Sequence, residues 1–329
     1  MRSIRQLLLM ITIVIVVGFA WVLLNDHVDA LWNLRLAYIA MYATVLSGMV
    51  LLVGHSGQVS LGHGAFMAVG GYTFALALTR GWSLPIAFVA VVVVGIAFGL
   101  GVGVVAARLS GPYLAGLTLG LAVGLPALAN RFPELLGGDS GLLLDGPYPP
   151  DSFGMDFPLE RWQSWIAGAV GIVAFTMIAA LITSPAGRAI RAVRDHEVAA
   201  ALAGVDRSRT KIAAFAVSAV CAALAGAVLT TILGLAAPGA FGIGLSLSLL
   251  VGVVVGGRQS LVGAGIGALL LALLPELLGN AVSGLALPER IAVNLAGLVY
   301  GLLLLLTVGL APAGVAGLLR RVGRNRLPQ

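Results

Sequence analysis

The sequence predicts an all-α integral membrane protein with about ten transmembrane helices and with both termini in the cytoplasm. Three observations lead to this fold class: 60% of the 329 residues are hydrophobic, only 10% are charged, and the mean hydropathy is +1.06. A water-soluble globular chain carries roughly 25% charged residues. We therefore expect residues 1–329 to form a single transmembrane domain.

Apolar stretches follow one another along the chain, and each is a candidate membrane span. Backbone amides in hydrocarbon must be hydrogen-bonded within the protein, and the lengths of these stretches suit helices rather than barrel strands. The stretch 243–257 is short and rich in glycine, so a tilted, broken or re-entrant helix is an alternative to a full crossing. The stretches are 7–24, 36–53, 59–79, 84–107, 113–130, 163–183, 212–235, 243–257, 261–279 and 291–310.

The first stretch also has features of a signal peptide, because Arg2 and Arg5 precede it. It is longer than the roughly 7–15 apolar residues of a typical signal-peptide core. This length favours a retained first span. Cleavage near the small-residue site Val28-Asp29-Ala30 is the alternative.

The distribution of positive charge predicts the orientation. If the N-terminus is inside and all ten stretches cross, most of the 19 Lys and Arg residues lie on the inner side, as the positive-inside rule requires. The loop 131–162 is then extracytoplasmic and the loop 184–211 is cytoplasmic. Because the basic residues cluster at span ends and in one loop, topology explains the net charge of +6 and nucleic acid is not an expected partner. The exceptions on the outer side are Arg35, Arg80, Arg131, Arg161 and Arg290.

Glycines spaced four apart predict close helix contacts, since small residues let helix backbones approach one another in a membrane. Two such ladders stand out, Gly95-Gly99-Gly103 and Gly116-Gly120-Gly124. We expect both to serve packing.

The cytoplasmic loop is predicted to contain a helix. Ser184 is a candidate N-cap and Pro185 suits the first helical position. Three arginines spaced three apart then follow one side of the helix, which ends at Gly204. A solvated connector anchored by its charges is one interpretation, and a docking helix for a soluble partner is the other.

A polar, glycine-rich segment interrupts the apolar sequence between the second and third stretches. It reads Gly54-His-Ser-Gly-Gln-Val-Ser-Leu-Gly-His-Gly-Ala-Phe66. A cytoplasmic turn before a helix start explains it, and so does a broken helix that lines a transport pathway. Part of this segment, GQVSLGHG at 57–64, is echoed by GRQSLVGAG at 257–265, through chance or through an internal duplication.

The sequence contains no constellation typical of an enzyme. The only lysine, Lys211, is not part of a Walker A loop, so the chain is not expected to bind or hydrolyse ATP itself. Two histidines, His55 and His63, make a weak case for a metal site without carboxylate or thiolate ligands nearby, and no metal is expected. Charged residues within spans are nearly absent, with Glu276 beside Pro275 as the exception, which argues against a proton-coupled carrier.

Several motifs follow one another in order along nearly the whole chain. They are Gly54-x-x-Gly57-Gln58-x-Ser60-Leu61-Gly62-His63-Gly64-Ala65-Phe66, Gly137-Gly138-x-x-Gly141-Leu142, Gly187-Arg188-Ala189 through Asp195-x-Glu197-x-Ala199-Ala200 with Gly204 and Lys211, Gly256-Gly257 with Gly263, and Ala311-Pro312-x-Gly314. In these motifs the chain resembles the LivM-type permeases, the membrane subunits of ABC importers for branched-chain amino acids and related small polar substrates. The loop residues depart from the usual docking pattern E-A-A-x-x-x-G, because Val198 follows Glu197 and Gly204 comes later than expected.

The resemblance implies a multi-pass protein of the bacterial inner membrane that works with other subunits. These are a second permease chain in a heterodimer, two cytoplasmic ATPases that carry ATP and Mg, and an extracytoplasmic substrate-binding protein. The expected ATPase-docking residues are Arg188, Arg191, Arg194, Asp195, Glu197, Ala199, Ala200 and Gly204. Polarity within an apolar region predicts the residues that line the pathway, which are Gly57, Gln58, Ser60, Gly62 and His63.

The sequence leaves three questions open. The second permease chain is either a different chain or a second copy of this one. Branched-chain amino acids are the substrate that the resemblance implies, with urea and short amides as alternatives. A secondary carrier or channel for small solutes, which would work without an ATPase, is the alternative function.

Overall fold

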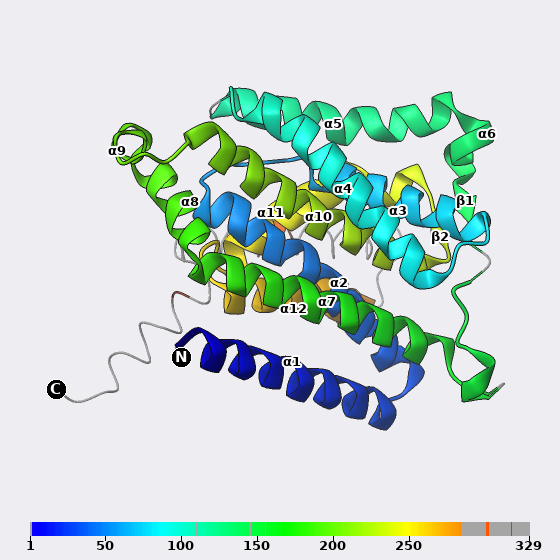
Figure 1. Cartoon of the computed structure of the whole chain (residues 1–329). Helices are drawn as coiled ribbons and strands as arrows, with labels where there is room; N and C mark the ends of the chain where they lie inside the picture. Colours follow the sequence, from blue (N-terminus) through cyan, green and yellow to red (C-terminus); the bar gives the residue numbers. More distant parts are fainter. Residues whose placement is uncertain are drawn as a thin grey trace.

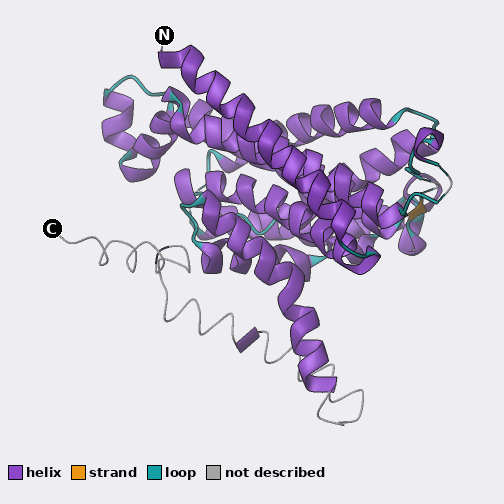
Figure 2. Cartoon of the chain, turned by 90° about the horizontal axis from the view of Figure 1, so that it is seen from below, coloured by secondary structure: helices purple, strands orange, loops and turns teal. Residues whose placement is uncertain are grey.

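The computed structural model describes residues 2–109, 111–144, 146–154, 156–283, 301–302 and 317, and helices make up most of it (Figure 2). Its two short strands, β1 and β2, pair antiparallel, with Leu142 opposite Ala236. The elements are α1 (Arg2–His27), α2 (Ala30–Met49), the π-helix η1 (Val50–His55), α3 (His63–Thr79), α4 (Leu84–Ala106), α5 (Pro112–Arg131), α6 (Pro133–Leu136), η2 (Gly138–Ser140), β1 (Leu142–Leu143), η3 (Asp151–Phe153), α7 (Leu159–Thr183), α8 (Pro185–Asp195), α9 (Glu197–Leu202), α10 (Arg207–Leu233), β2 (Leu235–Ala236), η4 (Pro238–Phe241), α11 (Ile243–Gly256) and α12 (Leu261–Ser283).

The all-α membrane class is confirmed, because 7 helices within the described residues are long and apolar enough to cross a membrane. Two further expected spans correspond to α1 and to α3, which has 17 residues. The expected span 291–310 and the motif at 311–314 lie outside the described residues. The number of ten spans and the cytoplasmic termini therefore stay predictions. The 7 helices are Ala30–His55, Leu84–Ala106, Pro112–Arg131, Leu159–Thr183, Arg207–Leu233, Pro238–Gly256 and Leu261–Ala281.

Helices α2 and α10 form the centre of the bundle. Helix α10 packs against α2, α3, α4 and α7, and it is buried over most of its length. Figure 1 shows α4 and α5 along one side of this centre and α7 with α1 along the opposite side. The short helix α11 has 14 residues, which span about 21 Å at the rise of an α-helix. It is preceded by the 3-10 turn η4, so this region of the bundle is not one continuous straight helix.

Glycines allow α3, α4 and α10 to pack at very short range. A Cβ atom on Gly226 of α10 would lie 1.8 Å from the carbonyl oxygen of Met67 in α3. The ladder Gly95-Gly99-Gly103 faces α10, with Ala219 and Phe215 among the residues it meets. The second predicted ladder, Gly116-Gly120-Gly124 on α5, meets no atom of the described chain within 4 Å. Its role in packing is therefore not visible within this chain.

The two long connections lie at opposite ends of the bundle (Figure 1). The segment 131–162 contains α6, η2, β1 and η3 at one end, where β1 joins β2 at the end of α10. The segment 184–211 contains α8 and α9 at the other end. This separation is what a loop on each side of a membrane requires.

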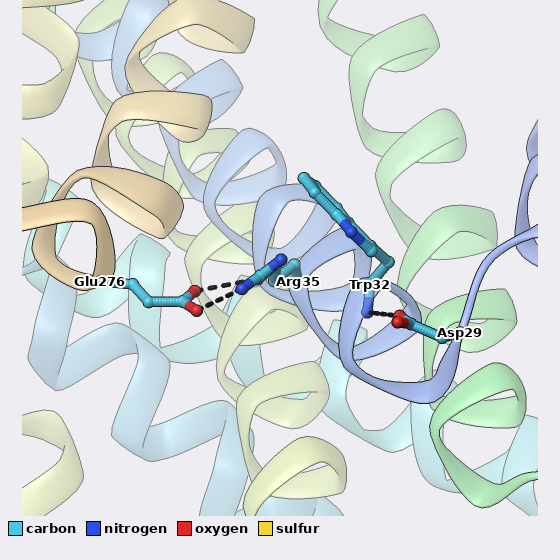
Figure 3. A network of polar contacts seen from close by, with 4 residues as sticks. All are labelled: Asp29, Trp32, Arg35 and Glu276. Atoms are coloured by element: carbon cyan, nitrogen blue, oxygen red, sulfur yellow. Dashed lines mark hydrogen bonds and ion pairs between the residues drawn. The ribbon is translucent and has the colours of Figure 1, made fainter. Parts of the chain in front are cut away.

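A charge pair near one end of the bundle joins α2 to α12 (Figure 3). The guanidinium of Arg35 donates to both carboxylate oxygens of Glu276, and the Nε–Oε2 distance is 2.9 Å. Trp32 lies against Arg35, with its ring centroid 4.5 Å from the guanidinium carbon. Asp29 caps the start of α2 by accepting from the backbone N–H of Trp32 at 2.8 Å. The pair neutralises the charged side chain that the sequence placed within the 261–279 stretch.

The close approach at Gly226 predicts a large effect of a single methyl group. We expect Gly226→Ala to lower the thermal midpoint in detergent, because overpacking costs roughly 1–3 kcal/mol and the added carbon would overlap the Met67 carbonyl. Gly120→Ala is the matched control in another helix, where a Cβ meets nothing described. There the higher helix propensity of alanine leaves stability unchanged or raises it. Equal midpoints for the two variants would contradict this account of the α3–α10 contact.

The Arg35–Glu276 pair predicts rescue by charge exchange. We expect Arg35→Glu and Glu276→Arg each to lower the thermal midpoint, because each places two like charges together between α2 and α12. The double variant restores opposite charges and should recover part of the loss. Differential scanning fluorimetry of the wild type, the two single variants and the double variant in one detergent measures the thermal midpoints. A midpoint in the double variant that is lowered by the sum of the two single losses would exclude a direct interaction.

Candidate translocation and coupling site

The polar segment between α2 and α3 interrupts the helical structure, as the sequence predicts. Helix α2 continues into the π-helical turn η1, in which the N–H of Ser56 donates to the Leu51 carbonyl at 2.9 Å. The chain then leaves helical geometry at Gly57, whose φ is +72°, and regular helix resumes at His63. Positive φ values favour glycine, which accounts for the residue at this turn. We call residues 54–62 the interrupted segment.

Side chains from other helices satisfy the backbone at the end of the interrupted segment. The N–H of Leu61 donates to the hydroxyl of Thr118 on α5 at 2.9 Å. The N–H of Gly64, in the first turn of α3, donates to the hydroxyl of Ser246 on α11 at 3.0 Å. The sequence pattern did not identify Thr118 or Ser246 as partners of this segment. Isolated Ser and Thr residues in apolar helices are common, and only the fold shows which of them meet an interrupted backbone.

The predicted pathway residues are mostly enclosed. Gln58 is 5% exposed, and its side-chain nitrogen donates to the Ser56 hydroxyl at 2.7 Å and to the Lys211 carbonyl at 3.2 Å. Ser60 is fully buried, and its hydroxyl accepts from the N–H of Gly62 at 3.3 Å. Gly62 is the N-cap residue of α3 and packs against Thr118.

His63 lies in the core between α3 and α10. It is 1% exposed, and its Nε2 lies 2.9 Å from the hydroxyl of Ser218 on α10. Its ring also meets Phe66 edge-on. The structure therefore gives Ser60, Gly62 and His63 roles in packing, and their part in a transport pathway stays a prediction.

The start of the predicted loop helix is confirmed. Ser184 caps α8 by accepting from the N–H of Gly187 at 3.3 Å, and Pro185 is the first helical residue. The expectation of one helix up to Gly204 is wrong, because the chain breaks at His196, which has extended backbone angles. His196 then caps α9, since its Nδ1 accepts from the N–H of Ala199 at 3.4 Å. This side-chain cap favours a new helix over continuation of the first.

The three loop arginines do not share one exposed face. Arg188 is exposed, whereas the guanidinium of Arg191 donates to the Ile182 carbonyl at 2.9 Å. Arg194 reaches into the bundle and donates from Nη1 to the Gly54 carbonyl at 2.6 Å. Its Nε also donates to the neighbouring Asp195 at 2.8 Å.

The other predicted docking residues belong to α9 and to the ends of α8 and α9. Asp195 and Ala199 are exposed, and Ala200 is buried. Glu197 forms an ion pair with Lys211 at the start of α10. Gly204 has a φ of +84° and ends this part of the loop, as predicted. Whether these residues contact an ATPase stays a prediction.

A cavity of about 340 Å³ lies where the two predicted groups of residues meet. Gly57 and Gln58 come from the interrupted segment, and Arg194 and Glu197 come from α8 and α9. Its wall is completed by Lys211 and by residues at the start of α5, so polar and apolar groups both face it. The lining residues are Ser56, Gly57, Gln58, Val59, Leu109, Gly111, Pro112, Leu114, Ala115, Arg194, Glu197 and Lys211.

The chemistry available here is hydrogen bonding and charge pairing. Across the part of the chain that the structure describes, no group of three or more His, Cys, Asp or Glu side chains could hold a metal ion. Such a site can bind a polar solute or change shape when α8 and α9 move.

Residues 34–308 match the model of a family described as the permease component of branched-chain amino acid transport systems. The chain belongs to this permease family. It is therefore a multi-pass membrane transport subunit, which agrees with the resemblance seen in the sequence.

Individual relatives lead to the same family. The chain is 29% identical to the high-affinity branched-chain amino acid transport system permease protein LivM of Salmonella typhimurium and 28% identical to LivM of Escherichia coli; each alignment covers 83% of this chain and 68% of the relative. It is also 37% identical, over 36% of its length, to the ribose import permease protein RbsC of Haemophilus influenzae. No solved structure matches this permease.

Proposed function

We propose that this permease is the membrane subunit of an ATP-driven importer for branched-chain amino acids in a bacterial inner membrane. The observation that carries the proposal is the family match over residues 34–308, which includes both the interrupted segment and the loop with α8 and α9. The transport function named for the two LivM relatives, high-affinity branched-chain amino acid transport, supports this substrate class.

The proposed assembly contains a second permease chain, two cytoplasmic ATPases and an extracytoplasmic binding protein. ATP and Mg are held by the ATPases, and this chain supplies the gate. The binding protein delivers substrate at the end of the bundle that carries segment 131–162. The ATPases act at the opposite end, where α8 and α9 lie (Figure 1).

The exposed apolar side chains of α9 support the proposal that a soluble partner docks on this helix. Leu202 is 87% exposed and Val198 is 60% exposed, at the end of the bundle away from β1 and β2. Covering large exposed apolar side chains with a groove on a partner lowers the free energy and so favours binding. The neighbouring charges of Arg188 and Asp195 would fix the orientation of the docked helix.

The first test is co-purification of the ATPase. We expect the wild-type permease, extracted in mild detergent, to retain ATPase subunits, and Leu202→Asp to reduce that retention at least about tenfold, since a charge replaces the exposed apolar anchor. Leu143→Asp is the matched control, because Leu143 is also highly exposed, at 77%, but lies at the other end of the bundle.

The outcome separates the two candidate functions. A wild-type permease that purifies without any ATPase and still transports leucine would identify a secondary carrier or channel. Equal loss of the ATPase from both leucine variants would argue that α9 is not the docking element.

The second test concerns the cavity. We expect Gln58→Ala to reduce ATP-dependent leucine uptake at least about tenfold at equal amounts of folded permease, because it removes a cavity wall and the hydrogen bonds to Ser56 and Lys211. Gln163→Ala is the matched control. Gln163 is 8% exposed and donates to the Thr231 carbonyl at 2.9 Å, away from the cavity.

His63→Ala extends the same uptake assay to a predicted pathway residue that does not line the cavity. We expect uptake to fall here too, because the imidazole holds the start of α3 against α10. Unchanged uptake for both Gln58→Ala and His63→Ala at normal expression would contradict the assignment of Gln58 and His63 to the pathway.

A further inference from the structure

Arg194 points away from the surface on which a docked ATPase would lie. Its side chain is 24% exposed, and its Nη1 lies 2.6 Å from the Gly54 carbonyl oxygen at the end of η1. The remaining polar contact, to Asp195, is with its own neighbour in α8. The guanidinium is therefore largely engaged within this chain.

The Gly54 carbonyl is a favourable acceptor for a cation. It belongs to the last turn of the helix formed by α2 and η1, where carbonyl groups lack regular helical partners and the helix dipole is negative. A charged donor makes this hydrogen bond stronger than a neutral one. Arg194 thus stabilises the point at which regular helix gives way to the interrupted segment.

The aliphatic part of Arg194 packs on the same segment. A Cβ atom on Gly57 would lie 2.9 Å from Cγ of Arg194, so the absence of a side chain at Gly57 makes room for the arginine. Both ends of the arginine side chain are therefore in contact with residues 54–57. Because of these contacts, a movement of α8 is expected to move residues 54–57 as well.

A second connection joins α9 to the interrupted segment through α10. Glu197, the first residue of α9, pairs with the Lys211 ammonium, and the backbone carbonyl of Lys211 accepts from Gln58. All the residues of this connection line the same cavity as Arg194. The two connections attach both parts of the loop helix pair to one short stretch of irregular backbone.

We infer that Arg194 is a positioning residue that couples movement of α8 to the interrupted segment, and that it is not a contact with the ATPase. This inference rests on the proposed function, because the movement is supplied by the docked ATPase. A segment without a regular helical ladder changes conformation at a lower cost than the helices around it. Displacement of α8 would pull on the Gly54 carbonyl and so reshape the cavity beside Gln58.

The test uses the complete importer, purified with its co-purifying subunits and reconstituted in liposomes. We expect Arg194→Ala to retain the ATPase subunits and their ATP hydrolysis but to lose at least about tenfold in leucine uptake. Arg194→Lys keeps a cation that can reach one acceptor, and should recover part of the uptake. Arg207→Ala is the control, since Arg207 is an exposed arginine at the start of α10 and outside both connections.

A second measurement needs no ATPase. Amide hydrogen exchange in residues 54–62 should become about tenfold faster in Arg194→Ala and should not change in Arg207→Ala, because only the first variant frees the Gly54 carbonyl. Unchanged exchange in Arg194→Ala would overturn the inference.

The remaining outcomes separate the inference from the function on which it rests. Loss of ATPase subunits from Arg194→Ala, with retention in the wild type, would make Arg194 a docking contact and overturn the inference alone. Normal uptake by Arg194→Ala would also overturn it. Absence of ATPase from the wild-type complex would overturn the proposed function, and the coupling role with it.

Discussion

The structure depends on how an interrupted backbone is satisfied inside a helical bundle. Buried N–H and C=O groups that lack partners are costly, and in a membrane they must be satisfied by the protein itself. Here Thr118 and Ser246 accept from the backbone near the start of α3, and Arg194 donates to the Gly54 carbonyl. The interrupted segment and the first turn of α3 therefore connect α5, α11 and the loop helices.

The sequence predicted the features that are set by local chemistry. The apolar stretches predicted the membrane class, and Ser184 predicted the start of α8. The glycines and polar residues at 54–62 predicted the interruption of the helical structure. It did not predict the partners of that segment, since Thr118 and Ser246 look like ordinary residues of apolar helices. The break at His196 was not predicted, because the Ala-rich loop favours helix and histidine is not among the residues that commonly cap a new helix, as His196 does for α9. The cavity could not be predicted, because it brings together segments that are far apart in the chain.

The internal echo in the sequence corresponds to a shared local geometry. Gly57 and Gly257 both have positive φ, at +72° and +123°. The serines three positions later are both buried, and the hydroxyl of Ser260 accepts from the N–H of Gly263 as that of Ser60 accepts from Gly62. The end of η1, just before the first turn, touches the second turn, because a Cβ atom on Gly54 would lie 1.6 Å from the carbonyl oxygen of Arg258. The common pattern G-x-x-S-L therefore encodes a turn that leads into a helix, whatever its evolutionary origin.

The row of loop arginines shows why spacing alone does not assign function to charge. Residues three apart on a helix lie on neighbouring but not identical lines, so each successive side chain is turned further around the axis. Over Arg188, Arg191 and Arg194 this rotation takes the guanidinium from solvent, to the end of α7, and then to the Gly54 carbonyl. One short helix thus presents one arginine to solvent and holds the interrupted segment with another. Under the proposed function, docking and coupling would belong to different faces of α8, and a docked partner would move the interrupted segment without touching it.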